Sequence, residues 1–289
     1  MASILWLHDA ACADSSLTGG KAANLSRLGA DVRVPPGFCL TAAAHQAAVE
    51  SQPVLSDALA GAVAAAYAEL AQLCGVDDPP VAVRSSAVDE DGAAASFAGQ
   101  HDTFLNIVGP DAVIEAIARC WASGHADHAR QYRERHGLHE RPVRVAVLVQ
   151  QLVPADVSGV VFSANPVNGR RDELVINASW GLGESIVAGR VTPDAYVVRR
   201  PDRHVTHRTI GDKTRMTVRT PAGTREVEVP RLLRRQPALT DAQIVELVDV
   251  VLGLELRMQV PVDVEVAWHG KDLYVLQCRP ITTIGAATL

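Results

Sequence analysis

The spacing of hydrophobic residues along the chain predicts a mixture of helices and strands. Apolar residues at helical spacing mark the segments 20–28, 41–50, 54–74, 111–121, 125–136 and 241–258. Short apolar runs, most of them rich in β-branched residues, predict strands at 3–7, 81–84, 103–108, 144–153, 159–163 and 173–178. Thr240 precedes the last helix as a candidate N-cap, because its hydroxyl can accept from the first helical turn.

Two changes in this pattern indicate how the chain is organised. The prolines in Val34-Pro35-Pro36-Gly37 fix an extended turn that no helix can include. After Gly181-Leu182-Gly183 the pattern becomes one of short alternating strands, up to about residue 229. With 48% hydrophobic residues the chain can bury a substantial core. We therefore predict an α+β protein of two lobes, 1–190 and 191–289, with a cleft between them.

Residues 85–100 are nearly all small or polar, SSAVDEDGAAASFAGQ. So much alanine, glycine and serine provides few side chains that could anchor the segment to a core. We predict a mobile loop here, with the composition of a lid that could close over phosphates.

The segment 262–279, VDVEVAWHGKDLYVLQCR, alternates between apolar and polar residues and predicts a hairpin. A three-residue turn at Gly270-Lys271-Asp272 would place Glu265 opposite Gln277, and Asp263 opposite Arg279. The apolar face would then carry Val264, Val266, Trp268, Tyr274, Leu276 and Cys278.

The polar face of this hairpin has two interpretations. It is either an exposed face with cross-strand pairs, or a metal–phosphate site. In the second case Glu265 and the carbonyl of Gln277 supply hard oxygen ligands for Mg²⁺, and Arg279 binds phosphate in a bidentate manner. A Mg-nucleotide triphosphate requires this combination of groups.

Lysine is rare in this chain, since Lys21, Lys213 and Lys271 are the only lysines among 27 basic residues. A lysine retained under such a bias indicates a position that needs a compact charge. Lys21 follows two glycines at a predicted helix start, where the helix dipole favours an anion, although the P-loop pattern is absent. Arg84 ends a predicted buried strand, so we expect its charge to face a cleft or a partner.

Charge and composition argue against several classes of protein. The net charge of −6 disfavours a nucleic-acid-binding domain, and the interrupted basic cluster at 199–208 is interpreted as a solvated strand edge. No apolar run predicts a membrane span, and no basic flank precedes an apolar segment at the N-terminus. The five widely spaced cysteines are typical of reduced thiols. We expect a cytoplasmic protein without nucleic-acid or membrane partners.

Sequence strings spread over the whole chain occur in the order found in one known family. They are GGKAANLSRL, VPPGF, VRSSAVDEDGAAASFAGQHDTFLN, SGVVFSANP, GLGESIVAGRVTPD and VDVEVAWHGKDLYVLQCRPITT. Over about residues 15–284 the chain resembles the ATP-binding domain of pyruvate phosphate dikinase, phosphoenolpyruvate synthase and rifampin phosphotransferase. The resemblance implies an ATP-grasp-like fold with Mg-ATP held between the two lobes. In the loop, Gly92-Ala93-Ala94 replaces a Leu-Pro of the family, which increases its flexibility.

The resemblance also implies roles for matching positions in phosphate binding. Lys21, Arg84 and Arg279 would contact the ATP phosphates and take part in catalysis. Thr103 would contact a phosphate or the metal. Lys213 lies in a segment where family members tend to carry a lysine near the nucleotide, so it is a further candidate for phosphate contact.

Other matching positions would bind the rest of Mg-ATP. The resemblance agrees with the hairpin in assigning Mg²⁺ to Glu265 and Gln277. The loop over the phosphates would contribute Ser96, Gly99 and Gln100. The adenine would meet the segment that contains Gln150 and Leu152, through backbone groups and the Gln150 side chain.

Enzymes of this family add a swivelling domain whose histidine takes the phosphoryl group, and none of the ten histidines here lies in such a loop. The first hypothesis is a phosphotransferase module that passes the β-phosphoryl group of ATP to a histidine on a separate chain, with AMP and phosphate as products. One alternative is a self-sufficient ATP-grasp kinase or ligase that acts on a small molecule. Another is a non-catalytic nucleotide-binding module. The sequence could also be one domain of a longer enzyme, and it does not specify the final acceptor.

Overall fold

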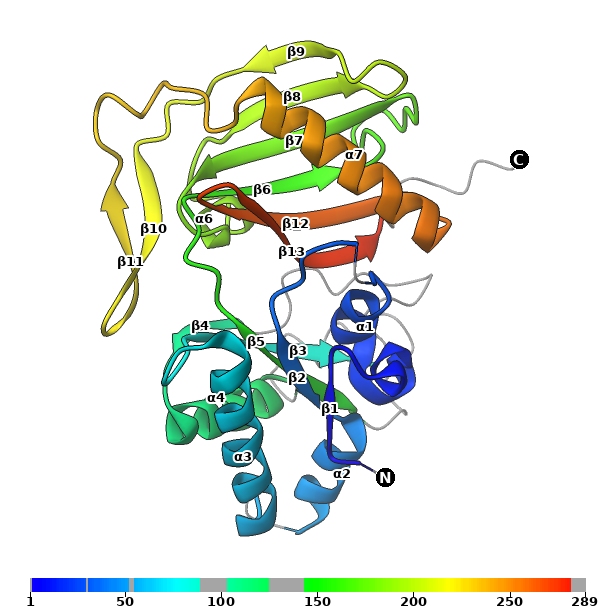
Figure 1. Ribbon diagram of the computed structural model, residues 1–289, viewed down its shortest axis with the longest axis vertical. Helices are drawn as coiled ribbons and strands as arrows, with labels where there is room; N and C mark the ends of the chain where they lie inside the picture. Colours follow the sequence, from blue (N-terminus) through cyan, green and yellow to red (C-terminus); the bar gives the residue numbers. More distant parts are fainter. Residues whose placement is uncertain (1, 30, 52–54, 89–102, 125–142, 282–289) are drawn as a thin grey trace. The chain divides into compact units, whose positions relative to one another are not determined.

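The computed structural model describes residues 2–29, 31–51, 55–88, 103–124 and 143–281. The chain forms two compact units, each built of helices and an antiparallel sheet (Figure 1). Unit 1 consists of Met1–Arg27 and Pro35–Leu152, and unit 2 of Leu28–Val34 and Val153–Leu289. The α+β class with two lobes is confirmed. The division falls after Leu152 and not near residue 190, because the strands between these positions belong to the sheet of unit 2.

The sheet of unit 1 has five strands in the order β1-β2-β5-β3-β4. Their bounds are β1 Ile4–Trp6, β2 Gly37–Leu40, β3 Val81–Ala87, β4 Thr103–Ile107 and β5 Val145–Gln151. Strand β3 is longer than the sequence predicts, since Ser85, Ser86 and Ala87 pair with β5 and are buried. The loop predicted for residues 85–100 therefore does not include its first residues, and residues 89–100 lie outside the described part of the chain.

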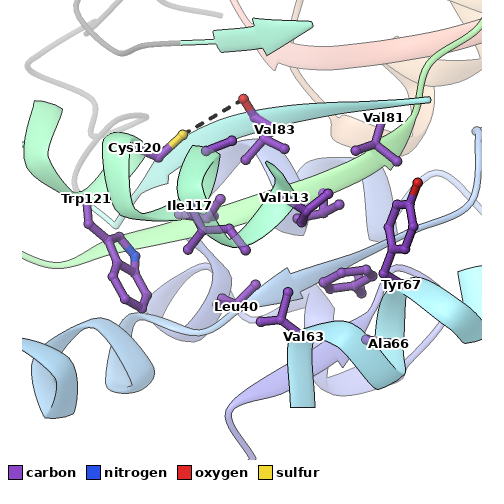
Figure 2. Packing of buried hydrophobic residues seen from close by; sticks show 14 of the residues in the cluster. Leu40, Val63, Ala66, Tyr67, Val81, Val83, Val113, Ile117, Cys120 and Trp121 are labelled. Carbon is purple, nitrogen blue, oxygen red and sulfur yellow. Dashed lines mark hydrogen bonds between the residues drawn. The ribbon is translucent and has the colours of Figure 1, made fainter. Parts of the chain in front are cut away.

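The helices of unit 1 pack on both faces of this sheet. They are α1 Ser15–Ser26, α2 Ala42–Ser51, α3 Asp57–Cys74 and α4 Pro110–Ser123, preceded by the short 3₁₀ helix η1 Ala10–Ala13. Figure 2 shows that Val113 and Ile117 of α4 lie between Val83 of β3 and Val63 of α3 in one hydrophobic cluster. Odd-numbered residues of β3 and β5 enter this core, so their even-numbered neighbours face the other side, where α1 contacts both strands.

Unit 2 has a six-stranded antiparallel sheet in the order β13-β12-β6-β7-β8-β9. The strands are β6 Val157–Phe162, β7 Glu173–Trp180, β8 Asp194–Arg199, β9 Val205–Thr209, β12 Val262–His269 and β13 Asp272–Pro280. A separate two-stranded hairpin consists of β10 Arg215–Thr220 and β11 Gly223–Glu228. The short helix α6, Glu184–Val187, follows β7.

Helix α7, Asp241–Met258, lies across one face of this sheet (Figure 1). Its bounds match the prediction, and Thr240 and Gln243 form a reciprocal capping box at its start. Its buried residues are Ile244, Leu247, Val248, Val251 and Leu254, spaced at three to four residues as expected for an amphipathic helix. Because α7 covers one face, the polar side chains of β12 and β13 belong to the other face.

Candidate functional site

The sheet of unit 1 collects predicted phosphate-binding residues on the face that contacts α1. Arg84 of β3 is 9% exposed and stands directly opposite Thr103 of β4. Directly opposed residues of antiparallel strands project to the same face. Gln150 of β5 pairs with Ala82, two residues before Arg84, and so belongs to that face too. Three residues predicted separately from the sequence to contact the nucleotide therefore share one surface of unit 1.

Lys21 belongs to helix α1, which contacts this face of the sheet. The helix is broken at Gly19, whose φ of 71° and ψ of 171° are not helical. Beyond the break, the backbone N–H of Ala22 donates to the Ser86 hydroxyl of β3 at 3.4 Å. Because Ser86 and Arg84 are two residues apart on one strand, the helix that carries Lys21 packs on the face that carries Arg84.

The predicted adenine segment uses several hydrogen-bond donors inside unit 1. The Gln150 side chain donates to the Pro35 carbonyl at 3.2 Å, and Gln150 is 1% exposed. The Leu152 N–H donates to the Pro80 carbonyl at 2.8 Å. These bonds tie the end of β5 to two proline-containing segments. Adenine contact at Gln150 and Leu152 stays a prediction, and in this arrangement it would involve groups other than these two donors.

In unit 2 the hairpin of β12 and β13 has the cross-strand pairs that the sequence predicts. Glu265 pairs with Gln277, and Asp263 pairs with Arg279. The predicted three-residue turn is wrong, since His269 already pairs with Asp272 and leaves a two-residue turn. A bulge next to Glu265 inserts one extra residue in β13, and this restores the predicted pairing beyond it.

The bulge changes which residues of β13 are buried. Leu273 and Val275 are buried, whereas Tyr274 and Leu276, which were predicted for the core, are half-buried. The pairing of Val266 with Val275 brings Val275 onto the buried face of β12. The alternation of apolar residues could not reveal this change, because one inserted residue reverses the faces of the rest of the strand.

Asp263 and Arg279 form an ion pair on the polar face of this hairpin. The Arg279 Nε and Nη2 atoms donate to Asp263 Oδ2 at 2.8 and 2.7 Å. Asp263 Oδ1 is also buried but has no hydrogen-bond partner among the residues that the structure describes. Burial raises the pKa of Asp263, Arg279 opposes the shift, and the neighbouring Glu265 adds to it. Two carboxylates, those of Asp263 and Glu265, thus share this face with the guanidinium of Arg279.

The groups on this face fit a magnesium ion. Glu265 and Gln277 offer a carboxylate and an amide oxygen from opposed positions, and the second Asp263 oxygen has no donor within the described part of the chain. Hard oxygen donors suit Mg²⁺, which usually takes one or two carboxylates and completes its shell with water and phosphate. Within the described residues there is no cluster of three or more His, Cys, Asp or Glu that could hold a metal. One carboxylate and one amide oxygen are too few for an all-protein cage, so these two donors suit a metal whose shell a phosphorylated ligand and water complete.

Lys213 is placed differently from the other predicted phosphate ligands. Its side chain and that of Asp194 are both 0% exposed, and they form an ion pair. The Lys213 Nζ atom also donates to the Gly211 carbonyl at 3.2 Å. In this arrangement the lysine stabilises the interior of unit 2. Phosphate contact at Lys213 stays a prediction that would require this pair to open.

The basic cluster around β8 and β9 carries its own counterions. Its arginines pair with carboxylates as Arg199–Asp202, Arg200–Glu255, Arg203–Asp249 and Arg208–Asp241. Three of these carboxylates belong to α7, so the cluster connects the strand edge to this helix. The structure thus uses these charges to join elements of unit 2.

Three predicted site residues lie outside the described part of the chain, and two residues with structural roles were not predicted from the sequence. Ser96, Gly99 and Gln100 of the predicted phosphate loop lie outside the described residues. Asp194 and Ser86 were not singled out, although each forms a buried contact that organises its unit. A lone aspartate after Pro193 and the second serine of a Ser-Ser pair give no distinctive pattern, because their partners are distant in sequence.

Most of the chain matches the model of one known protein family. Residues 46–288 match the family model of the pyruvate phosphate dikinase AMP/ATP-binding domain. The chain belongs to this family. The resemblance carried by the sequence strings is confirmed.

Curated relatives of the AMP/ATP-binding domain include several named enzymes. A probable phosphoenolpyruvate synthase of Methanocaldococcus jannaschii is 37% identical over 98% of this chain and 27% of its own length. A rifampicin phosphotransferase of Streptomyces sviceus is 39% identical over 93% of this chain and 34% of its own length. The phosphoenolpyruvate synthase of Pyrococcus furiosus is 35% identical over 97% and 44%. The chain therefore spans less than half the length of these relatives.

Among solved structures, D-alanine–D-alanine ligase of Bacillus anthracis complexed with ATP resembles this family member with a TM-score of 0.37 and 11% identity. That match covers 96% of this chain and 57% of the ligase. No helix in the described part of the chain is long and apolar enough to cross a bilayer.

Proposed function

We propose that this chain is the Mg-ATP-binding module of a dikinase-type phosphotransferase with an ATP-grasp-like fold. One phosphoryl group, the β group of ATP, passes to a histidine on a partner domain or chain, and the γ-phosphate passes to water. The products are AMP, phosphate and the phosphohistidine. The family to which the chain belongs, and the enzymes among its relatives, support this reaction type.

The observation that carries the proposal is the polar face of the β12–β13 hairpin. Glu265 is paired with Gln277 across the two strands, and Asp263 is paired with Arg279 and holds its guanidinium. A carboxylate and an amide for a metal, next to a guanidinium for phosphate, form the set that Mg-ATP needs. Within unit 1, Arg84 and the helix that carries Lys21 lie on one face of the sheet.

In the proposed mechanism the chain acts by electrostatics and positioning. Bound Mg²⁺ would neutralise charge on the phosphate oxygens. Arg84 and Arg279 would donate N–H groups to phosphate oxygens, and Lys21 would supply a compact positive charge. Asp263 holds Arg279 through two hydrogen bonds to one oxygen, which limits how far that guanidinium can turn. The transfer to histidine requires no general base in this chain if the acceptor histidine arrives neutral.

Binding measurements with Mg-ATP test this proposal directly. The double variant Glu265→Ala with Gln277→Ala should lose magnesium-dependent ATP binding in isothermal titration calorimetry, because it removes both proposed metal ligands. Lys271→Ala is the matched control, since this residue lies exposed at the tip of the same hairpin. Unchanged magnesium-dependent binding in the double variant would show that this hairpin is not the metal site.

Product analysis separates the proposed function from a self-sufficient kinase or ligase. The chain is incubated with Mg-ATP and followed by phosphorus NMR, with and without an added phosphohistidine-type domain from a related enzyme. We expect slow turnover by the chain alone, and AMP plus phosphate as products when the domain is present. Rapid formation of ADP with a small-molecule acceptor would instead favour a self-sufficient enzyme. Mg-ATP binding without any turnover, even with the domain, would favour a non-catalytic module.

A further inference from the structure

Helix α1 begins a second time at its break. Gly19 has non-helical dihedral angles, and the residues after it return to the helix. Gly19 is thus the N-cap of this second start, Gly20 the first helical residue, and Lys21 and Ala22 the second and third. The first N–H groups of a helix have no partner within the helix, and the N-cap side chain usually accepts from the second or third. Glycine has no side chain that could do this.

Ser86 of β3 supplies the missing acceptor from a distant part of the sequence. Its hydroxyl accepts from the N–H of Ala22, the third residue of the new start, at 3.4 Å. This is the hydrogen bond that a serine at position 19 would make as a conventional N-cap. Ser86 is 0% exposed, so its hydroxyl depends on protein partners. The helix start is therefore capped by a neighbouring strand.

The close packing at Gly19 makes this arrangement specific. A Cβ atom at position 19 would lie 2.1 Å from the Ser86 carbonyl oxygen and 2.5 Å from its hydroxyl oxygen. The φ of 71° is also one that residues with side chains rarely adopt. An N-cap side chain on Gly19 is thus excluded by the same contact that brings Ser86 close enough to replace it.

We propose that Ser86 is a positioning residue that fixes Lys21 on the Arg84 face of the sheet. Lys21 is the second residue of the capped turn, and Arg84 is two residues before Ser86 on β3. A cap from β3 ties the backbone that carries Lys21 to the strand that carries Arg84. Ser86 itself contacts no phosphate in this scheme. The inference rests on the proposed function, since it assigns Ser86 to the phosphate-binding role of Lys21.

The test compares Ser86→Ala with Ser85→Ala. Ser85 is equally buried on the same strand but projects to the opposite face. We expect Ser86→Ala to weaken Mg-ATP binding about fivefold, which corresponds to the ~1 kcal/mol of one lost N-cap. It should also speed amide hydrogen exchange at Ala22. Ser85→Ala should change neither the affinity nor the exchange rate of Ala22.

A second background separates positioning from a general loss of stability. In a Lys21→Ala chain, Ser86→Ala should still speed exchange at Ala22 but should weaken ATP binding no further, because the group that it positions is gone. An equal loss of affinity in both backgrounds, or unchanged exchange at Ala22, overturns the inference. If Ser86→Ala does not fold, Ser86→Cys retains nearly the same size with a weak acceptor and is measured in its place.

Failure of the proposed function and failure of the positioning role of Ser86 give different experimental results. If the unsubstituted chain does not bind Mg-ATP, the proposed function fails, and the phosphate-positioning role of Ser86 fails with it. If the chain binds Mg-ATP but Ser86→Ala binds it equally well, the proposed function stands and the inference on Ser86 is overturned.

Discussion

Lys213 and Asp194 form a fully buried ion pair that connects separate segments of unit 2. Asp194 also accepts the backbone N–H groups of Gly211 at 2.9 Å and Ala238 at 2.7 Å, and the hydroxyl of Tyr196 at 3.3 Å. The carboxylate thus joins the start of β8 to the segment before β10 and to the approach to α7. A charge this deep is tolerated because nearly all of its acceptor capacity is used.

Removing either member of this pair should strongly destabilise the chain. Lys213→Met leaves a buried carboxylate without its cation, which costs about 3–5 kcal/mol of unfolding free energy. Asp194→Ala should cost at least as much, since it also leaves two backbone N–H groups without an acceptor. Urea unfolding followed by circular dichroism measures both, with exposed Lys271→Ala as the control. A loss below about 1 kcal/mol in both variants would contradict a structural role for the pair.

Lys21→Arg should weaken Mg-ATP binding even though it keeps the charge. A guanidinium is planar and longer than an ammonium, so it cannot place a compact charge at the same point. We expect a loss of affinity of about tenfold or more, equal to roughly 1.4 kcal/mol. Lys271→Arg, on the exposed turn of the β12–β13 hairpin, is the matched control for exchanging lysine for arginine. Full affinity in Lys21→Arg would mean that lysine is rare in this chain for reasons unrelated to function.

The buried Asp263 should make stability depend on pH in a recognisable direction. Burial raises the pKa of Asp263 in the folded chain above its ordinary value of 3.8, so the folded state binds a proton more readily than the unfolded state. The contribution of Asp263 to stability is therefore lost as the pH rises from about 4 through its folded pKa. Relative to Asp263→Asn, the unsubstituted chain should lose unfolding free energy over this range. Urea unfolding at a series of pH values measures the difference.

An exposed aspartate provides the control for this pH dependence. Hydrogen bonds from Arg199 lower the pKa of Asp202. Asp202→Asn should therefore show the opposite sign, since the contribution of Asp202 is present above pH 4 and is lost as the pH falls. The same slope for both variants would contradict the assignment of the Asp263 effect to burial.

The buried thiols should resist alkylation in the folded chain. Burial raises the pKa of Cys12 to about 11, and its side chain is 0% exposed. The thiolate is the reactive form, so both its low population and its burial slow the reaction. Cys74 is partly exposed and should react with iodoacetamide first at pH 8, as peptide mass spectrometry can determine. Equal rates at Cys12 and Cys74 in folded protein would contradict the buried position of Cys12.

The sequence predicted local elements well where the pattern was long and the ends were marked. Helix α7 has its predicted bounds, because Thr240 and Gln243 cap it and its apolar residues keep helical spacing. The pairing of Glu265 with Gln277 was also predicted, although through a turn of the wrong length. The turn is one residue shorter than predicted, and the bulge adds one residue to β13. The two departures therefore cancel beyond the bulge, where Glu265 and Asp263 have their predicted partners.

The candidate site was predicted as residues but not as an arrangement. Lys21, Arg84 and Thr103 came from motifs, and the structure brings α1, β3 and β4 together on one face of unit 1. Lys213 was grouped with the phosphate ligands because lysine is rare in the chain and because members of the resembling family tend to carry a lysine in this segment. The burial of its partner Asp194 depends on how β8 packs under distant segments, so the sequence pattern does not reveal it.

By itself, the sequence determined the family, the α+β class and most of the local elements of this protein. These depend on nearby residues, such as hydrophobic spacing, helix caps and motifs, whose effects act within a few residues. The tertiary structure alone decided that the units divide after Leu152, that Lys213 is buried against Asp194, and that Ser86 caps the helix of Lys21. Each of these depends on contacts between residues far apart along the chain, and such contacts are fixed only when the sheets and helices pack.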